Sequence, residues 1–213
     1  MKRIIALTLI IGCLLCLASC KKEPEVEPEV DYGPAVAEIQ SIVDASAPGI
    51  VNILVTHTSD LGELNGTYYV VYNADGSATV TYTYEKFNEF NENHPTDEIK
   101  SPYSGTAHLD ADGTVYDEEG NDDVLDAVFF ELKLDKSKLE DVTVVAGVLK
   151  AKIKAGNTAA VLGTAVGGDV KITVVTGTDG ITSMSLSYDT LNGHVEISTV
   201  YSYPVVEDAD DAE

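Results

Sequence analysis

Residues 170–203 read VKITVVTGTDGITSMSLSYDTLNGHVEISTVYSY, and three runs within this stretch alternate apolar with polar side chains. An alternation with a period of two is typical of a strand that buries one face. Thr178-Asp179-Gly180 and Asn192-Gly193 separate the runs and are turn signals. The stretch therefore predicts a three-stranded antiparallel meander that is apolar on one face and rich in Ser and Thr on the other.

Turn length decides which residues of the meander face each other. A three-residue turn after the first strand pairs Val174 with Met184, and a two-residue turn at Asn192-Gly193 pairs Tyr188 with Ile197. With both registers the apolar side chains share one face, which we expect to be buried. Its members are Val170, Ile172, Val174, Met184, Leu186, Tyr188, Ile197 and Tyr201.

Two short helices are predicted before the meander. The first covers 34–45, where Val36 and Ile39 recur at helical spacing after a proline that suits the first helical position. The second is brief, with Asn157 as its expected cap and Gly163 as its expected end.

Several further strands are predicted from β-branched and aromatic residues. They cover 50–58, 67–72 and 78–84, and the last two flank the turn signal Ala74-Asp75-Gly76. Alternation over Phe130–Leu134 predicts another half-buried strand.

These elements predict one α+β domain over 34–204, predominantly of antiparallel β-structure. A sheet with one polar face has to cover its other face. We therefore expect a one-sided sheet that is curved on itself or capped by the short helices.

The N-terminus has the pattern of a secretory signal. Lys2 and Arg3 precede an apolar run over 4–18 that is shorter than the roughly 20 residues of a transmembrane helix. Its ending, Leu17-Ala18-Ser19-Cys20, resembles the lipobox of bacterial lipoproteins. The resemblance implies that residues 1–19 are removed and that Cys20 carries acyl chains. The membrane would then be a partner through this anchor, which fits either the outer leaflet of the cytoplasmic membrane or the outer membrane.

The segments that flank the domain are acidic. Residues 20–33 read as a tether rich in Pro and Glu, and residues 205–213 as an acidic disordered tail. The whole chain has 13 Lys and Arg against 36 Asp and Glu, a net charge of −23. Such a surface repels nucleic acid and anionic headgroups. We therefore expect no nucleic-acid partner, and contact with the membrane through the anchor alone.

A lipidated cysteine, then a helix, then a long antiparallel sheet resemble the lipoprotein carriers of the LolA/LolB and mycobacterial LppX/LprG type. The closing order is most similar to the LppX/LprG type: a strand over 148–153, a helix over 157–162 and the meander. The resemblance implies a half-open barrel whose concave face, covered by helices, holds acyl chains. No site residue of these families matches this chain by motif.

The residues give no positive sign of an enzyme. The sequence has neither a Gly-x-Ser-x-Gly elbow nor a glycine-rich phosphate loop, and its histidines lack metal-ligand spacing: His57, His94, His108 and His194. We therefore expect no catalytic residues, metal or cofactor. Asp110–Thr114 begins like a calcium loop, but its glycine stands fourth rather than sixth, which favours a hairpin turn. A paired-carboxylate glycosidase stays an alternative, because the separation of its carboxylates is spatial.

Two functions remain open. In the first, the domain binds a lipid or other hydrophobic ligand on the apolar face of the meander. In the second, the domain is a surface interaction or structural lipoprotein with a closed core and no ligand. A cavity between sheet and helices would favour the first, and tight filling of that space would favour the second.

Overall fold

The computed structural model describes residues 30–87, 100–111, 114–117 and 130–204, and every structural statement below concerns these residues. The chain divides into two compact units, Met1–Asp31 and Tyr32–Glu213, and the second holds the described helices and strands. The predicted signal peptide, Cys20, most of the tether and the acidic tail lie outside the described residues.

The described residues of the second unit form one antiparallel sheet of ten strands. The strand order is β5-β4-β3-β2-β1-β10-β9-β8-β7-β6, so the two halves of the chain meet where β1 pairs with β10. The strands are β1 (Ile50–Ser59), β2 (Gly62–Tyr72), β3 (Ala78–Phe87), β4 (Lys100–Leu109), β5 (Val115–Asp117), β6 (Leu139–Val145), β7 (Val148–Ile153), β8 (Val170–Thr176), β9 (Ile181–Thr190) and β10 (Gly193–Ser202). The helices are α2 (Gly33–Ala45), α4 (Thr158–Leu162) and the 3-10 turns η1 (Lys136–Lys138) and η2 (Ala155–Asn157).

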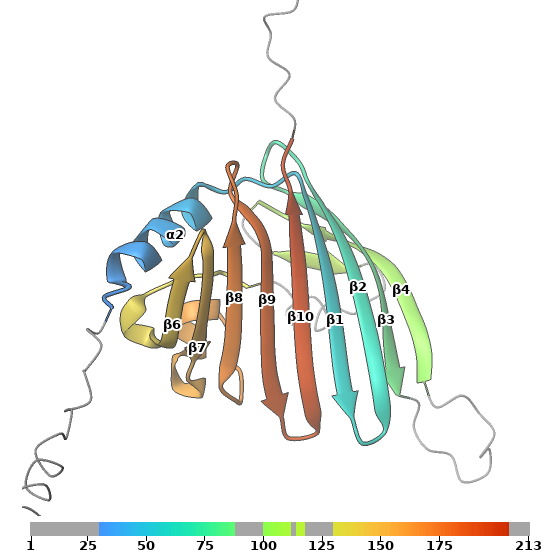
Figure 1. The fold of residues 1–213 in the computed structure, drawn as a ribbon. Coiled ribbons are helices and arrows are strands. Elements are labelled where there is room, and N and C mark those ends of the chain that lie inside the picture. The colour runs from blue at the N-terminus through green and yellow to red at the C-terminus, as the bar shows by residue number, and fades with distance from the viewer. Residues whose placement is uncertain (1–29, 88–99, 112–113, 118–129, 205–213) are drawn as a thin grey trace, which may run out of the picture. The chain divides into compact units, whose positions relative to one another are not determined.

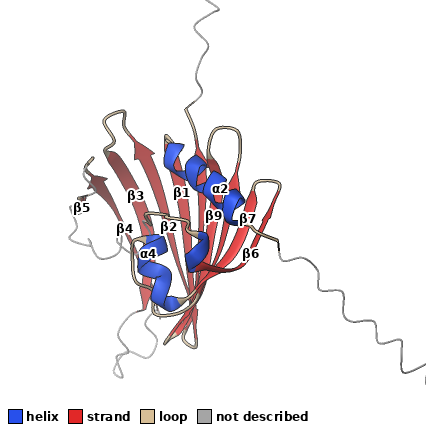
Figure 2. Ribbon diagram, turned by 90° about the vertical axis from the view of Figure 1, so that its left-hand side faces the viewer, coloured by secondary structure: helices blue, strands red, loops and turns tan. Residues whose placement is uncertain are grey.

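Within this unit the sheet curls into a half-open barrel (Figure 1). Figure 2 looks into the open side, where α2 and α4 lie over the concave face of the sheet. We call the face toward these helices the inner face and the opposite face the outer face. The predicted fold class, a curved and mostly antiparallel sheet with short helices on one side, is confirmed.

The meander predicted over 169–203 forms as β8, β9 and β10, and its first register is confirmed. Val174 lies opposite Met184, and Ile172 lies opposite Leu186. Gly180 in the turn between β8 and β9 has a φ of 142°, a backbone conformation that favours glycine.

The predicted register of the second hairpin is wrong. Tyr188 lies opposite Val195 rather than Ile197, because Leu191 and Asn192 form the turn and Gly193 already begins β10. Gly193 has a φ of 155°, and a Cβ there would collide with the carbonyl oxygen of Thr58 on β1. The glycine thus serves the close approach of a neighbouring strand rather than the turn. The error amounts to two residues, so each side chain keeps its predicted face.

The strand predicted over 130–134 is also wrong. Residues 130–135 are extended but pair with no strand in the described part of the chain; we call them the strap. Their backbone groups bond to the helical side instead. Gln40 of α2 accepts a hydrogen bond from the Leu134 N–H and donates one of 3.4 Å to the Leu132 carbonyl. The Lys133 N–H donates to the carbonyl of Val161 in α4 (2.7 Å), so the strap lies between the two helices.

Replacing Gln40 with Leu should lower the free energy of unfolding by about 1–3 kcal/mol, because two strap backbone groups lose their partner. Denaturant unfolding followed by circular dichroism measures this change. Glu38→Leu, at an exposed position of the same helix, is the matched control and should stay within about 0.5 kcal/mol of the wild type. Equal stabilities of the two variants would show that the Gln40 bonds contribute nothing.

The C-terminal end of α2 is fixed to the start of β9. The Ile181 N–H donates to Ser46 Oγ (3.1 Å), and the Tyr203 hydroxyl donates to the Ile181 carbonyl (2.9 Å). Val36 and Ile39 of α2 are buried. The helix predicted over 34–45 is therefore confirmed, and it packs on the inner face at the end of the sheet where β9 begins.

The short helix α4 lies between Asn157 and Gly163, where it was predicted. Gly163 ends it in the left-handed conformation, with a φ of 74°, as expected. Asn157 makes no side-chain cap; its amide instead donates to the Lys138 carbonyl (3.3 Å).

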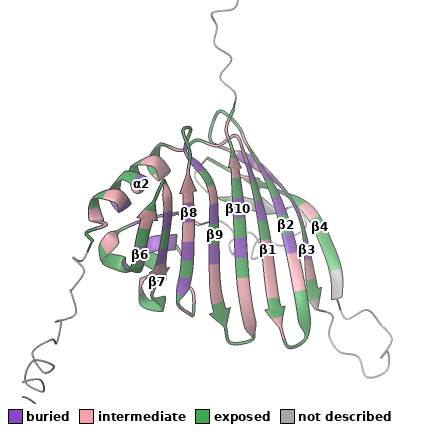
Figure 3. Ribbon diagram, in the orientation of Figure 1, coloured by how far each residue is buried: buried purple, intermediate pink, exposed green. Residues whose placement is uncertain are grey.

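Burial alternates along the strands, with buried inner residues between more exposed outer ones (Figure 3). This is the pattern of a sheet with one solvated face. Among the described residues, no helix combines the length and apolarity that crossing a membrane requires.

Candidate functional site

The inner face is almost free of charge, although the chain has 36 acidic residues. Among the described side chains, no Asp or Glu occupies an inner position of the strands. The buried members form one continuous apolar core that includes Val36 and Ile39 from α2 and Leu132 and Leu134 from the strap. The inner face is therefore the natural place for an apolar ligand.

A cavity of about 110 Å³ lies on the inner face where β9, β10, β1 and β2 stand side by side. Its lining residues come from these strands, from the loop after α2 and from the first residue of the strap: Pro48, Val51, Ile53, Tyr72, Phe130, Met184, Thr199 and Tyr201. Ligand pockets in proteins usually measure about 300–1,000 Å³. The cavity in this conformation is therefore smaller than a typical ligand pocket.

Three hydroxyl groups are the polar part of this lining. Thr199 is buried, and the phenols belong to Tyr72 and Tyr201. Burial raises the pKa of Tyr72 above its ordinary value. Burial also raises the pKa of Tyr201, and the nearby Tyr72 and Tyr203 raise it further. Both phenols therefore stay neutral at physiological pH and are available as hydrogen-bond donors.

A row of tyrosines crosses β2, β3 and β4 on the inner face: Tyr68, Tyr82, Tyr84 and Tyr103. Successive ring centroids lie 6.2, 5.8 and 5.5 Å apart. Gly105 lies opposite Tyr82, and a Cβ at this position would collide with the Tyr82 hydroxyl. Lys86 Nζ lies 5.3 Å from the Tyr84 ring centroid and 5.2 Å from that of Tyr103. The row fills this half of the inner face with stacked rings and brings one cation to its end.

The tyrosine row predicts a loss of stability at alkaline pH. Burial first, and then the neighbouring Tyr84 and Tyr82, raises the pKa of Tyr68 to about 12. The unfolded chain releases this proton near pH 10 and the folded chain does not. Tyr68 thus makes its full contribution to the free energy of unfolding below pH 10. This contribution falls by up to about 1.4 kcal/mol per pH unit as the pH rises toward 12.

Urea unfolding at pH 9, 10 and 11 measures this slope, and Tyr68→Phe should make it shallower. Identical slopes in the two proteins would contradict a raised Tyr68 pKa.

The structure places all eight residues predicted for the ligand-binding face on the inner side. Six are buried: Val170, Ile172, Val174, Met184, Leu186 and Ile197. Tyr188 and Tyr201 are partly buried and pack against the core. Of the eight, Met184 and Tyr201 line the cavity.

The other lining residues were missed because they come from β1, β2 and the strap, far from the meander in the sequence. The sequence predicted a strand over 50–58, but nothing local showed that this strand would pair with β10. Phe130 was placed on a strand that does not form.

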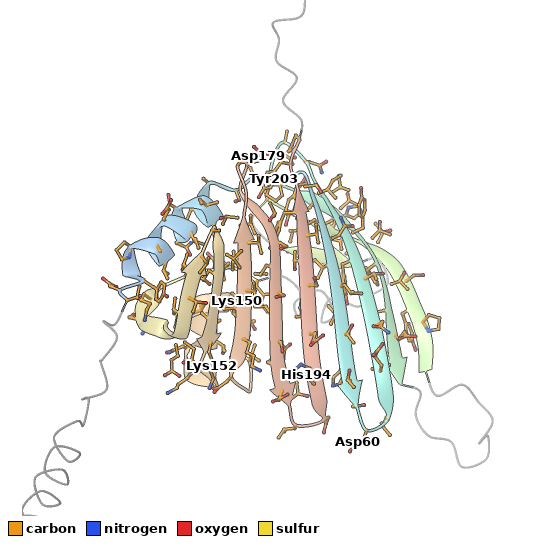
Figure 4. The ribbon with its side chains drawn as sticks, viewed as in Figure 1. Asp60, Lys150, Lys152, Asp179, His194 and Tyr203 are labelled. Carbon is orange, nitrogen blue, oxygen red and sulfur yellow. The ribbon has the colours of Figure 1, made fainter. Side chains whose placement is uncertain are left out.

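The histidines give no metal site in the described part of the chain. His194 Nδ1 lies 2.7 Å from Asp189 Oδ1, and its Nε2 lies 3.1 Å from Ser187 Oγ. His57 Nε2 is buried without a hydrogen-bond partner. His194 and Asp60 lie near the same end of the sheet (Figure 4). No group of three or more His, Cys, Asp and Glu among the described residues is placed to hold an ion.

The segment weighed as a calcium loop is described at its two ends. The Asp110 N–H donates to the Thr114 carbonyl (2.8 Å), which joins the ends of β4 and β5 as in a hairpin. Asp112, Gly113 and the acidic residues 118–123 lie outside the described residues.

No protein-family model and no curated protein matches the sequence. Three solved structures have a loosely similar arrangement. LprF from Mycobacterium bovis has a TM-score of 0.35 and 15% identity, over 79% of this chain and 95% of that one. A fusion DH domain has a TM-score of 0.20 and 13% identity, over 74% of this chain and 72% of that one. A dehydratase studied for the borrelidin and fluvirucin polyketide synthases has a TM-score of 0.21 and 12% identity, over 81% of this chain and 80% of that one. At these values the similarity assigns neither a family nor a function.

Proposed function

We propose that the chain is a lipid-anchored envelope protein whose domain binds a lipid or another hydrophobic ligand on the inner face of its sheet. The observation that supports a ligand site is the cavity lined by Phe130. It is an apolar space with three hydroxyls on the inner face of the half-open barrel. Ligand sites are usually apolar with a few placed polar groups. The anchor rests on the sequence Leu17-Ala18-Ser19-Cys20.

The strap is the element that admits the ligand. In the described structure it is joined to α2 and α4 by three hydrogen bonds and to no strand. Leu132 and Leu134 of the strap belong to the core, whereas Phe130, its first residue, is only partly buried and is the part of the strap with the least to lose on opening. Movement of the strap would extend the cavity from Met184 toward the remaining residues of the meander face, the eight proposed for binding.

A fluorescent fatty acid tests this function in solution. The unlipidated chain, stripped of endogenous lipid, should bind it saturably at tens of micromolar or below, and unlabelled fatty acid should displace it. Met184→Trp fills the cavity and should abolish binding while the protein stays folded. Val200→Trp, at an exposed outer position of β10, should bind like the wild type.

One observation favours the alternative of a closed interaction lipoprotein. Val170, Ile172, Val174 and Leu186 are at most 2% exposed, so the inner face over β8 and β9 is already filled. In this alternative the cavity is a packing defect and the domain acts through its surface. Absence of saturable fatty-acid binding in the folded wild type would assign the protein to this class.

A further inference from the structure

Three side chains on the outer face of β9 and β10 are joined by hydrogen bonds in series. Ser187 and Asp189 alternate with the inner residues Leu186 and Tyr188 of β9, and His194 lies directly opposite Asp189 on β10. His194 Nδ1 lies 2.7 Å from Asp189 Oδ1, and its Nε2 lies 3.1 Å from Ser187 Oγ. Each ring nitrogen of the histidine therefore has a different partner at hydrogen-bond distance.

The direction of these two bonds follows from the carboxylate. Because the ionised Asp189 can only accept, a neutral His194 carries its proton on Nδ1 and donates it to Asp189. Nε2 then accepts from the Ser187 hydroxyl. Glu196 Oε1 lies 3.6 Å from Nε2, where its charge favours the imidazolium that forms when the serine proton moves to the ring. A serine bonded to a base that a carboxylate orients is the arrangement of an activated nucleophile.

A cation lies beside this serine. Lys171 on β8 is directly opposite Ser187 and is exposed on the same face. Lys152, its neighbour on β7, forms an ion pair with Asp169 (2.7 Å), whereas Lys171 forms none with any described residue. Its ammonium is therefore available to stabilise negative charge that develops on a carbonyl oxygen at Ser187.

Ser187 and His194 each border a hollow. Ser187 lines one of about 270 Å³ together with Leu54, which is 48% exposed, and this volume suits a short acyl group beside the nucleophile. His194 lines another of about 830 Å³ at the turns that end the sheet, which leaves room for a leaving group beside the base. Glu196 also lines the first hollow, so an anionic substrate is disfavoured there.

We propose that Ser187 and His194 are catalytic residues that hydrolyse uncharged carboxylic esters with a short acyl group, and that Asp189 positions His194. Ser187 Oγ attacks the ester carbonyl carbon while its proton passes to His194 Nε2. The bond from the acyl carbon to the alcohol oxygen then breaks, and His194 gives the proton to the departing alcohol. Water adds to the acyl-serine by the same route, with His194 as the base, and releases the carboxylic acid.

The exposure of the site selects esters over amides. The side chains of His194 and Asp189 are 40% and 90% exposed, so a substrate reaches them directly. Water also weakens the electrostatic stabilisation that the poorer leaving group of an amide requires. The site lies on the opposite face of the sheet from the cavity, so this proposal does not depend on the proposed lipid ligand.

Diisopropyl fluorophosphate tests the nucleophile by mass spectrometry of the full mature chain, in a detergent without an ester bond. The wild type should gain a diisopropylphosphoryl group on Ser187 with release of fluoride, as peptide masses would show. Ser187→Ala and His194→Gln should gain none. Ser183→Ala, on the outer face of the same strand but in neither hollow, should be labelled like the wild type.

Hydrolysis of p-nitrophenyl acetate by the same proteins measures catalysis. Ser187→Ala and His194→Gln should each lower kcat/KM at least about tenfold. Asp189→Asn should lower kcat and leave KM unchanged, because Asp189 acts through His194 rather than on the substrate. Asp189→Glu, which keeps the carboxylate, should retain more activity than Asp189→Asn.

Two results would overturn the proposal. One is a folded wild type that takes up no probe at Ser187, and the other is a wild type that hydrolyses the ester no faster than Ser187→Ala. The three side chains would then only join the ends of β9 and β10. Because all of them lie on the outer face, neither result changes the fatty-acid titration.

Discussion

Truncation of Leu186 to Ala should lower the free energy of unfolding by about 2–5 kcal/mol. Leu186 is 1% exposed and lies between Ile172 of β8 and Ile197 of β10 on the inner face. Removing its side chain leaves a void in the packed core. The surrounding strands cannot collapse into this void, because their register is fixed on both sides.

Denaturant unfolding of the wild type, Leu186→Ala and Ser185→Ala measures this effect. Ser185 is exposed on the outer face of the same strand, so its replacement should change stability by less than about 0.5 kcal/mol. Similar small losses in both variants would contradict the assignment of Leu186 to the packed inner face.

Replacing Cys20 with Ser should abolish lipidation and leave the precursor unprocessed. The expectation follows from the cations, the apolar run and the ending Leu17-Ala18-Ser19-Cys20, since acylation requires the cysteine thiol. Several acyl chains anchor stably, at about 0.8 kcal/mol per buried CH₂, and the variant has none.

Metabolic labelling with a radioactive fatty acid and gel mobility measure both effects of this substitution. The wild type should be labelled and shortened, and Cys20→Ser should be neither. Ser19→Ala keeps a small residue at the cleavage site and should mature normally. Normal processing and labelling of Cys20→Ser would rule out a lipid anchor at this residue.

The meander was predictable because its information is local. Alternation in residues 170–203 gave the strands, and Thr178-Asp179-Gly180 gave the first register. The second register failed by two residues because Gly193 is required by the neighbouring strand β1, a contact more than 130 residues away in the sequence. Rules for short turns cannot predict such a distant contact. An error of two residues nevertheless leaves every side chain on its predicted face.

The strap shows how an extended segment can be mistaken for a strand. Leu132 and Leu134 alternate with exposed Glu131 and Lys133, as in a half-buried strand. The backbone groups of Leu132 and Leu134 bond to the Gln40 side chain, which lies more than 90 residues earlier in the sequence. Sequence periodicity cannot predict such a partner.

The candidate site was only partly predictable for the same reason. Met184 and Tyr201 were identified, but the remaining lining comes from β1, β2 and Phe130. These residues meet the meander only because β1 pairs with β10 and brings the two halves of the sheet together.

Native mass spectrometry of the protein purified from its own envelope tests the central claim most directly. If the inner face holds a hydrophobic ligand, the wild type should carry a noncovalent lipid mass that collisional activation releases, and Val200→Trp should carry it as well. Met184→Trp, folded and purified in the same way, should lack that mass. Two results would contradict a ligand site at the strap. One is a folded wild type whose mass equals that of the polypeptide and its anchor alone, and the other is equal lipid occupancy in the wild type and Met184→Trp.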